Sequence, residues 1–187
     1  MPHNVGSLFD LAAQTARDEL NGEGNLAYAP ERVSSVQDVA TQLTTNGPIT
    51  GGVIYFGHGA GRPYADGTWG SVLAPGEQAG PNTNVSADNV NLLSNQQLDP
   101  GATITLKSCY AGFGSGRYSI AQLIANRLQR KVYAPVAGTY FSINPNAIFA
   151  NGKVAPPIPT PAQKPIYMIQ EGGKPLQCFL PGLECHN

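Results

Sequence analysis

Apolar side chains recur at helical spacing in three stretches of the chain, residues 7–20, 34–47 and 119–130. Side chains at this spacing share one face of a helix, so each stretch is predicted to be a helix that packs on a core. The second and third stretches open with a serine followed three residues later by a glutamine, the pattern of a capping box. These pairs are Ser34 with Gln37 and Ser119 with Gln122. A fourth helix is predicted over 86–98, where Ser86 precedes an apolar stripe.

Short apolar runs lie between the predicted helices. The run at 51–56 is continuous, which is typical of a strand covered on both faces in a parallel sheet. Further strands are predicted over 102–108 and 131–137, a short strand over 25–30, and a strand or hairpin over 68–75. Strands that alternate with helices at these intervals predict an α/β fold, a three-layer αβα sandwich with a mostly parallel sheet.

The length of the chain fits a single domain over residues 1–187. The core of this domain is expected over about residues 25–145. Residues 146–187 begin with a proline-rich loop, which has too few N–H groups for a central strand. A C-terminal hairpin with arms at 166–170 and 176–182 is then expected to cap an edge of the sheet, since its short arms cannot stand alone.

The charge of the chain gives no sign of a polyanionic partner. The formal net charge is −1 and only 12% of the residues are charged, so we expect no nucleic-acid partner. No apolar segment reaches the length of a transmembrane helix, and the N-terminal sequence lacks the basic region of a signal peptide. We therefore expect no membrane span, and either a cytoplasmic protein or one exported by a route without such a signal.

Three cysteines are too few for a disulfide framework. Cys178 and Cys185 are close enough in the chain to pair under oxidising conditions. Together with His186 they form a C-x6-C-H pattern, which lacks the short spacing of a zinc knuckle, and no metal or other cofactor is expected. Cys109 stands alone in the middle of the chain.

Two short motifs place reactive side chains at the ends of predicted strands. In "VIYFGHGAG" (53–61) His58 follows an apolar run, and in "TITLKSCYAG" (103–112) Cys109 does the same. The carboxyl ends of parallel strands meet at one edge of a sheet, where α/β proteins collect their functional groups. The intervening chain is long enough for a right-handed crossover, so the two side chains are predicted to lie side by side.

A histidine beside a cysteine suits nucleophilic catalysis. A thiolate attacks a carbonyl carbon, and an imidazole can protonate the amine that leaves. Gly59 has no side chain to block its N–H, which is therefore a candidate donor to a developing oxyanion. Glycines at 112, 114 and 116 allow the backbone after the cysteine to approach a substrate closely.

The strings "IYFGHGAG" and "ITLKSCYAG" resemble the paired motifs of the caspase-like cysteine peptidases, a group that includes caspases, legumains, gingipains and self-cleaving domains of bacterial toxins. In that group an apolar strand ends in His-Gly and a second ends in Cys, with glycine soon after. The two residues are 51 positions apart here, close to the caspase spacing of about 50. The resemblance covers roughly residues 50–140. It departs from the family at Lys107 and Ser108, where caspases and legumains carry Gln-Ala or Glu-Ala.

The resemblance implies roles for individual residues. His58 corresponds to the catalytic histidine and Cys109 to the nucleophile, and the backbone N–H groups of Gly59 and Cys109 correspond to the oxyanion hole. Asp66 and Glu77 lie in the segment after the histidine and are candidates to receive a basic substrate side chain. The candidate substrate-binding residues are Asp66, Glu77 and Tyr110.

Two functions remain open from the sequence. The first is a cysteine endopeptidase that cuts a protein or peptide substrate, as a bacterial effector or toxin module. The second is a non-catalytic caspase-like domain that binds a peptide or partner at the same edge. Nucleotide binding and serine catalysis are disfavoured, because "GFGSG" (112–116) lacks the end of a P-loop and no G-x-S-x-G motif occurs.

Overall fold

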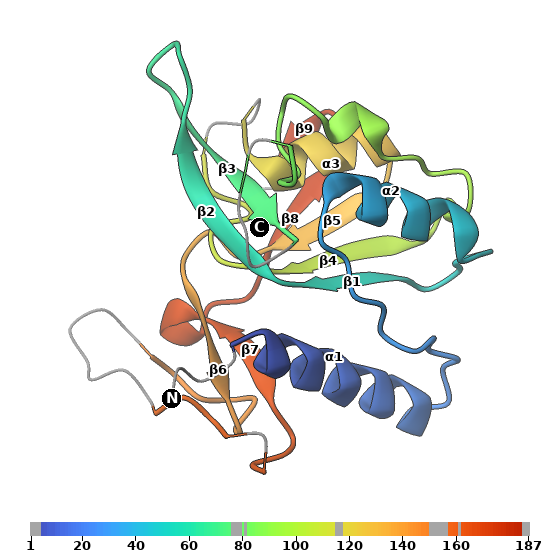
Figure 1. Cartoon of the computed structure of the whole chain (residues 1–187), viewed down its shortest axis with the longest axis vertical. Helices are drawn as coiled ribbons and strands as arrows, with labels where there is room; N and C mark the ends of the chain where they lie inside the picture. Colours follow the sequence, from blue (N-terminus) through green and yellow to red (C-terminus); the bar gives the residue numbers. More distant parts are fainter. Residues whose placement is uncertain are drawn as a thin grey trace.

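A computed structural model describes residues 5–75, 80, 82–114, 118–149, 157–160 and 162–184, with side chains from residue 8 to residue 182 of these ranges. Five strands form the main sheet, in the order β1–β4–β5–β8–β9 (Figure 1). Their bounds are β1 Gly52–Phe56, β4 Thr103–Lys107, β5 Lys131–Ala134, β8 Gln177–Leu180 and β9 Leu183–Glu184.

The first three strands of this sheet run parallel, and they are the three that the apolar runs predict. β1 pairs with β4 and β4 with β5 in parallel, whereas β8 lies antiparallel to β5 and β9 antiparallel to β8. The prediction of a mixed α/β fold with a mostly parallel sheet is confirmed. The strand predicted over 25–30 is wrong, because this stretch is irregular and largely exposed.

Helices lie on both faces of the main sheet, an arrangement compatible with a layered α/β sandwich. Figure 1 shows α2 (Val36–Thr45) and α3 (Ile120–Leu128) on one face and α1 (Val5–Gly22) on the other. The larger core lies between the sheet and helices α2 and α3, and it includes Leu106 of β4 and Val132 of β5.

A smaller layer covers the other face of the sheet. It consists of α1 and a two-stranded ribbon of β6 (Thr139–Ser142) and β7 (Tyr167–Gln170). Leu8 and Ala12 of α1 form a second buried cluster with Ile166, against which Phe56 of β1 packs. This cluster joins the first helix to the C-terminal part of the chain.

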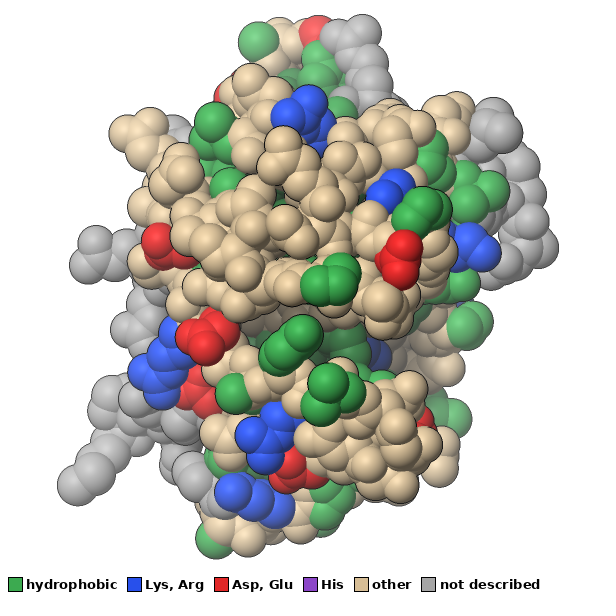
Figure 2. All heavy atoms as spheres, turned by 90° about the vertical axis from the view of Figure 1, so that its right-hand side faces the viewer, with side chains coloured by type: hydrophobic (Ala, Val, Ile, Leu, Met, Phe, Trp, Pro, Cys, Tyr) green, Lys and Arg blue, Asp and Glu red, His purple; other side chains and the backbone are tan. Residues whose placement is uncertain are grey.

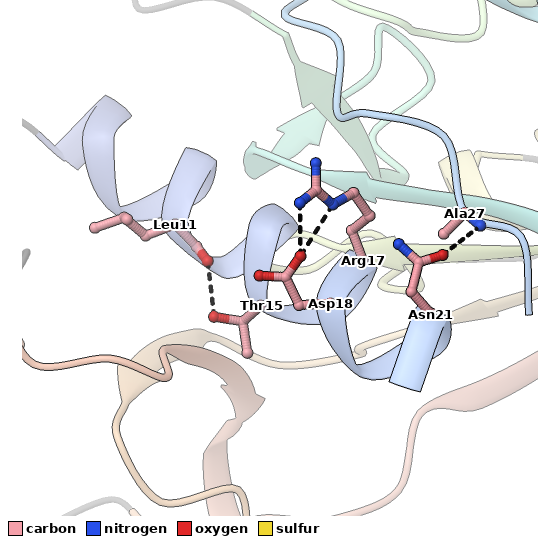
Figure 3. Close-up of polar contacts among 6 residues, drawn as sticks. All are labelled: Leu11, Thr15, Arg17, Asp18, Asn21 and Ala27. Carbon is pink, nitrogen blue, oxygen red and sulfur yellow. Dashed lines mark hydrogen bonds and ion pairs between the residues drawn. The ribbon is translucent and has the colours of Figure 1, made fainter. Parts of the chain in front are cut away.

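Hydrogen bonds fix the position and the end of α1 (Figure 3). The Thr15 hydroxyl donates to the Leu11 carbonyl at 2.8 Å and also accepts the N–H of Ile166 at 3.2 Å. Near the end of the helix, the Asn21 side chain accepts the N–H of Ala27 at 2.9 Å, which turns the chain back after the helix (Figure 3). Asn21 acts here as a local side-chain acceptor for the backbone.

The capping boxes differ from those predicted. In α2 the N-cap is Ser35, whose Oγ accepts the N–H of Asp38 at 3.1 Å, and not Ser34. The backbone N–H and the hydroxyl of Ser34 instead donate to the Asp38 carboxylate, and these bonds hold the pKa of Asp38 below its usual range. The Asp38 carboxylate therefore has the capping-box role that was predicted for the Gln37 side chain, one residue earlier in the chain.

The predicted Ser119 box at the start of α3 is also wrong. Ser119 is the N-cap, but its side chain makes no capping hydrogen bond, and Gln122 points elsewhere and donates to the Leu180 carbonyl at 2.7 Å. The N–H of Ile120 instead donates to the hydroxyl of Ser71, which belongs to a different element. The cap is supplied through tertiary packing, which the local sequence pattern does not reveal.

The predicted helix over 86–98 is wrong. This stretch contains one 3₁₀ turn, η1 (Val90–Leu92), although Leu93 and Leu98 are buried as expected. The Asn89 side chain accepts the N–H of Ser86 at 2.9 Å and donates to the Asn84 carbonyl at 2.7 Å. Asn and Ser side chains that bond the backbone locally compete with helix formation, and here they hold a compact loop.

The arms of the predicted C-terminal hairpin do not pair with each other. β7 pairs with β6 in the small ribbon, while β8 pairs with β5 in the main sheet, and the short η2 (Glu171–Gly173) follows β7. The hairpin at the edge of the main sheet consists of β8 and β9 instead. The reason is that Ile166, directly before β7, is buried in the smaller cluster, while Phe179 of β8 is buried in the larger one.

A hairpin of β2 (His58–Pro63) and β3 (Trp69–Ala74) leaves the main sheet directly after β1 (Figure 1). Of the strand or hairpin predicted over 68–75, the strand is confirmed as β3, and its hairpin partner β2 lies outside that stretch. Ser71 of β3 is fully buried, and its hydroxyl donates to the Ala111 carbonyl at 3.1 Å while it accepts the N–H of Ile120 at 3.0 Å. One side chain therefore ties the hairpin to both the loop after β4 and the start of α3.

The surface carries charges of both signs. On the face shown in Figure 2, Lys and Arg side chains are interspersed with Asp and Glu, and neither sign forms a continuous patch. Among the described residues, no helix is both long enough and apolar enough to span a membrane.

We expect Ser71→Ala to lower the free energy of unfolding by about 1–3 kcal/mol, because it leaves the Ile120 N–H without a partner and removes one of the two hydrogen bonds that the Ala111 carbonyl accepts. Urea denaturation followed by circular dichroism measures this change. Ser94→Ala is the matched control, because its hydroxyl makes only a long 3.4 Å contact with the Gln96 N–H in an exposed loop. Equal stabilities of the two variants would contradict the role assigned to Ser71.

Candidate active site

The ends of β1 and β4 lie side by side, as the motifs predict. The two strands are in register up to the pair Phe56 and Lys107, and the N–H of Gly57 donates to the Lys107 carbonyl at 3.2 Å. The chain then continues to His58 on one side and to Cys109 on the other. Two segments 51 positions apart in the sequence therefore emerge at one edge of the sheet.

Gly59 and Cys109 are in direct backbone contact. A side chain at position 59 would overlap the carbonyl oxygen of Cys109 and the hydroxyl of Ser108. Neither obstacle can move easily, since Cys109 contributes backbone and Ser108 is fully buried. Glycine at position 59 is thus what allows the two motifs to approach this closely.

The Cys109 thiol is half-buried and not in a disulfide. Its sulfur accepts the N–H of Thr139 at 3.2 Å and lies 3.2 Å from the Thr139 hydroxyl and 3.7 Å from the Thr139 carbonyl oxygen. Thr139 is the first residue of β6, so the small ribbon orients the thiol. The thiol also donates to the Thr139 carbonyl, so the backbone and the side chain of one residue together fix the direction of the sulfur.

His58 is the first residue of β2 and is exposed, rather than lying in a loop after β1. Its ring meets the ring of Phe9 edge-on at 4.8 Å between centroids, and Phe9 in turn meets Phe141 at 5.1 Å. Phe141 and Thr139 are two positions apart on β6 and so point to the same side of the ribbon. The imidazole and the thiol therefore both reach the region where α1 and β6 approach the end of the sheet.

The N–H and C=O of Gly59 point away from the neighbouring strand β3. Gly59 is opposite Leu73, and Leu73 exchanges both of its backbone hydrogen bonds with Val85 on its other side. In an antiparallel ladder a residue directs both groups to the same neighbour, so the Gly59–Leu73 pair is not hydrogen-bonded. The Gly61–Ser71 pair is likewise not hydrogen-bonded, because the N–H of Ser71 donates to the Tyr118 carbonyl on the other side of β3. The outer edge of β2 thus presents the backbone groups of two glycines.

The backbone after the cysteine forms a tight loop against the β5–β6 connection. Tyr110 has a φ of 56°, and its N–H donates to the Ala137 carbonyl at 2.9 Å. The N–H of Gly112 donates to the Pro135 carbonyl at 2.8 Å. No acceptor for the N–H of Cys109 lies within the described part of the chain. This N–H and the N–H of Gly59 are the two candidate donors for an oxyanion.

The other predicted site residues are placed differently. Asp66 lies in the turn of the β2–β3 hairpin, where its carboxylate accepts from the N–H and hydroxyl of Thr68 and from the hydroxyl of Tyr118 at 2.9 Å. These bonds shape the turn. Glu77 lies outside the described residues. Tyr110 flanks Cys109 and is partly exposed, beside an open pocket that it lines together with Trp69 and Phe113.

Two residues near the thiol are not predicted by the motifs. Thr139 contacts the sulfur directly, and the Glu171 carboxylate lies beside Gly138, where a side chain would be 3.7 Å from Glu171 Oε2 and 3.8 Å from the Tyr110 hydroxyl. Both come from outside the two motifs. Only the small and polar "AGT" at 137–139, directly after a predicted strand, hints at a functional loop there.

Polar side chains near the ends of β1 and β4 lie in largely apolar surroundings. Burial raises the pKa of the Tyr55 hydroxyl, which has no hydrogen-bond partner in the described part of the chain, and the same lack applies to the hydroxyl of Ser108. Burial also lowers the pKa of Lys107, the last residue of β4. Lys107 lines a cavity of about 460 Å³ between β7 and the β6–β7 connection, on the side of the sheet that faces the ribbon.

Neither the cysteines nor the acidic residues form a metal site among the described residues, where no three His, Cys, Asp or Glu side chains come together. Cys178 is disulfide-bonded. Its expected partner, Cys185, lies outside the described residues. The described chemistry of the site is therefore that of one thiol, one imidazole and oriented backbone donors.

Comparison with known proteins gives one match. A family model described as "Domain of unknown function (DUF8616)" matches residues 64–154, slightly less than half of the chain. The matched part includes Cys109 and begins after His58. No curated protein and no solved structure matches the chain significantly. The description of this family names no activity, so the function is inferred from the geometry of the site.

We expect Gly59→Ala to lower the free energy of unfolding by about 1–3 kcal/mol, because the new methyl group overlaps backbone that cannot move aside. Gly61→Ala is the matched control in the same strand, since its methyl group would meet only ordinary contacts at 3.7 Å or more. Thermal unfolding of both variants measures the difference. Two variants with the same melting temperature would show that the strand ends are less tightly packed than described.

We expect Lys107→Met to raise the free energy of unfolding near neutral pH, because it removes an ammonium group that the folded state desolvates. The folded-state pKa is lowered, so the wild type bears this cost at every pH below that pKa. The cost disappears once the folded and unfolded states are both neutral, and wild-type stability therefore rises with pH through this window.

The advantage of Lys107→Met should accordingly shrink as the pH is raised toward about 10, the range of an ordinary lysine. Urea denaturation at neutral pH and at this higher pH tests the trend. Lys131→Met is the control, because Lys131 is exposed at the other end of the sheet. An advantage that grew with pH would contradict the desolvation argument.

Proposed function

We propose that this protein is a cysteine endopeptidase of the caspase-like type, with Cys109 as nucleophile and His58 as general acid. The observation that carries the proposal is the backbone contact of Gly59 with Cys109 at two parallel strand ends. This contact sets an imidazole and a thiol at one edge of the sheet, together with two backbone N–H groups. The polar contacts of Thr139 with the sulfur support the role of the thiol as nucleophile.

The proposed reaction has two stages. The Cys109 thiolate attacks the carbonyl carbon of a peptide bond, and the N–H groups of Gly59 and Cys109 stabilise the oxyanion that forms. The C–N bond then breaks, His58 donates a proton to the leaving amine, and a thioester remains on the sulfur. Water then attacks the thioester and gives one proton to His58, which restores the general acid, and the acid product is released while the sulfur leaves as a thiolate.

The caspase-like assignment rests on the resemblance of the two motifs together with the mixed α/β architecture. Proteins with α/β sheets of this kind catalyse many different reactions. The residues at the edge of the sheet, rather than the layered architecture, therefore support the proposed activity. The substrate is proposed to be a protein or peptide, and the role that of an effector or toxin module, as among the bacterial members that the motifs resemble. No cofactor enters the proposed reaction.

We expect Cys109→Ala to abolish cleavage of a peptide library, and His58→Ala to reduce kcat/KM by about 10²–10⁴-fold, the usual contribution of general acid catalysis. Mass spectrometry of digests by the wild type and both variants measures this. His58→Gln keeps much of the packing on Phe9 and separates loss of the proton donor from loss of structure.

Labelling with iodoacetamide provides a readout that needs no substrate. Modification of Cys109 in the folded wild type at neutral pH is expected, and His58→Ala should slow it if the imidazole supports the thiolate. An unreactive Cys109, together with no cleavage of any peptide, would favour the alternative of a binding domain without activity.

A further inference from the structure

Three aromatic rings line an open pocket of about 410 Å³ beside Cys109. The rings are those of Trp69, Tyr110 and Phe113, and the fourth lining residue is Gly61. Trp69 is 55% exposed, Tyr110 40% and Phe113 38%, although large aromatic side chains gain free energy from burial. A cluster of exposed aromatic groups in a concave site marks a place where a ligand supplies the missing apolar contact.

The pocket forms where the β2–β3 hairpin packs against the loop after β4, which contains Cys109 and is called the cysteine loop. A side chain at Gly114 of this loop would overlap the backbone of Trp69 and Gly70, so glycine at position 114 allows the close approach that brings Trp69 near Phe113. Gly61 leaves open space in front of the Trp69 ring, where a side chain at this position would lie 3.7 Å from ring carbons. Tyr110 and Phe113 meet edge-on at 6.0 Å, so their rings form one continuous wall.

The position of the pocket relates it to the proposed reaction. Tyr110 directly follows the nucleophile, and Gly61 is two residues along β2 from the proposed oxyanion donor Gly59. Two residues of extended chain span about 7 Å, which is the spacing of alternate side chains in a bound peptide. The free backbone groups of Gly59 and Gly61 face outward along this path, as they would to pair with an extended peptide.

We infer that this pocket is the specificity pocket for an aromatic or large aliphatic side chain of the substrate, within two residues of the scissile bond. The inference rests on the proposed peptidase function and deepens it. No charged side chain is among the described residues that line the pocket, so an acidic or basic substrate side chain would lose its hydration without a partner. The pocket therefore selects against the basic side chain that Asp66 and Glu77 suggested from the sequence.

Cleavage assays test the pocket directly. Blocked peptides are compared that differ in one residue within two positions of the scissile bond. The wild-type protein should cleave those with Phe or Leu there with a kcat/KM about 10- to 100-fold higher than those with Ala, Arg or Glu. Gly61→Leu fills the pocket without a backbone clash and should erase this preference. Gly51→Leu is the control, because it lies at the opposite end of β1 in open space and should leave the preference intact.

A second readout is independent of cleavage. Trp69 is the single tryptophan of the chain, so a side chain that enters the pocket changes the fluorescence of this residue alone. The inactive Cys109→Ala variant is titrated with Ac-Ala-Ala-Phe-Ala-Ala-NH2 and with the same peptide carrying Ala, Arg or Glu in place of Phe. A saturable blue shift is expected with the Phe peptide, and Gly61→Leu in the same background should abolish it.

The outcomes separate the two proposals. Cleavage without an aromatic or aliphatic preference, or an emission change equal for all four peptides, overturns the pocket and leaves the peptidase. A selective emission change without any cleavage by the wild type supports the pocket and counts against the peptidase. A preference for Arg in either assay also overturns the pocket as described.

Discussion

The parallel pairing of β1 with β4 brings two backbones to one point, where Gly59 lies against the carbonyl group of Cys109. The candidate site depends on this contact, because the hydrogen bonds of a parallel ladder fix the register of both strands before the chain reaches His58 and Cys109. Register decides which residue of each motif reaches the edge, and a shift by one residue would turn every following side chain to the other face. The pairing of β1 with β4 thus determines where the chain places His58, Gly59 and Cys109.

Elements outside the sheet hold the rest of the site through buried polar bonds. Ser71 joins the hairpin, the cysteine loop and the start of α3, and Thr139 places the start of β6 on the sulfur. Phe9 of α1 supports the imidazole from the remaining side. Segments from several parts of the chain therefore meet near Cys109, and each segment is anchored in one of the two apolar clusters.

Sequence patterns predicted the parts of the molecule that depend on local periodicity. The continuous apolar run of β1 and the helical stripe of α3 were read correctly, and so was the position of the ends of β1 and β4 beside each other. One error has a local cause, because Asn89 bonds the backbone of its own loop in place of a helix. Two others arise from contacts between segments that are distant in the sequence. Ser71 caps α3 in place of Ser119, and Ile166 packs on α1 and draws β7 away from β8. Thr139 is absent from the motifs for the same reason, since only folding brings it to the thiol.

The connections on either side of the small ribbon run next to each other. The β5–β6 link and the start of η2 are joined by the hydrogen bond from Glu171 N–H to the Gly138 carbonyl at 2.8 Å, and Gln170 accepts the N–H of Val136 at 3.1 Å. Two connections bonded to each other restrict the ribbon more than a single connection would. Thr139 directly follows the bonded Gly138, so the same bonds also hold the residue that contacts the Cys109 sulfur.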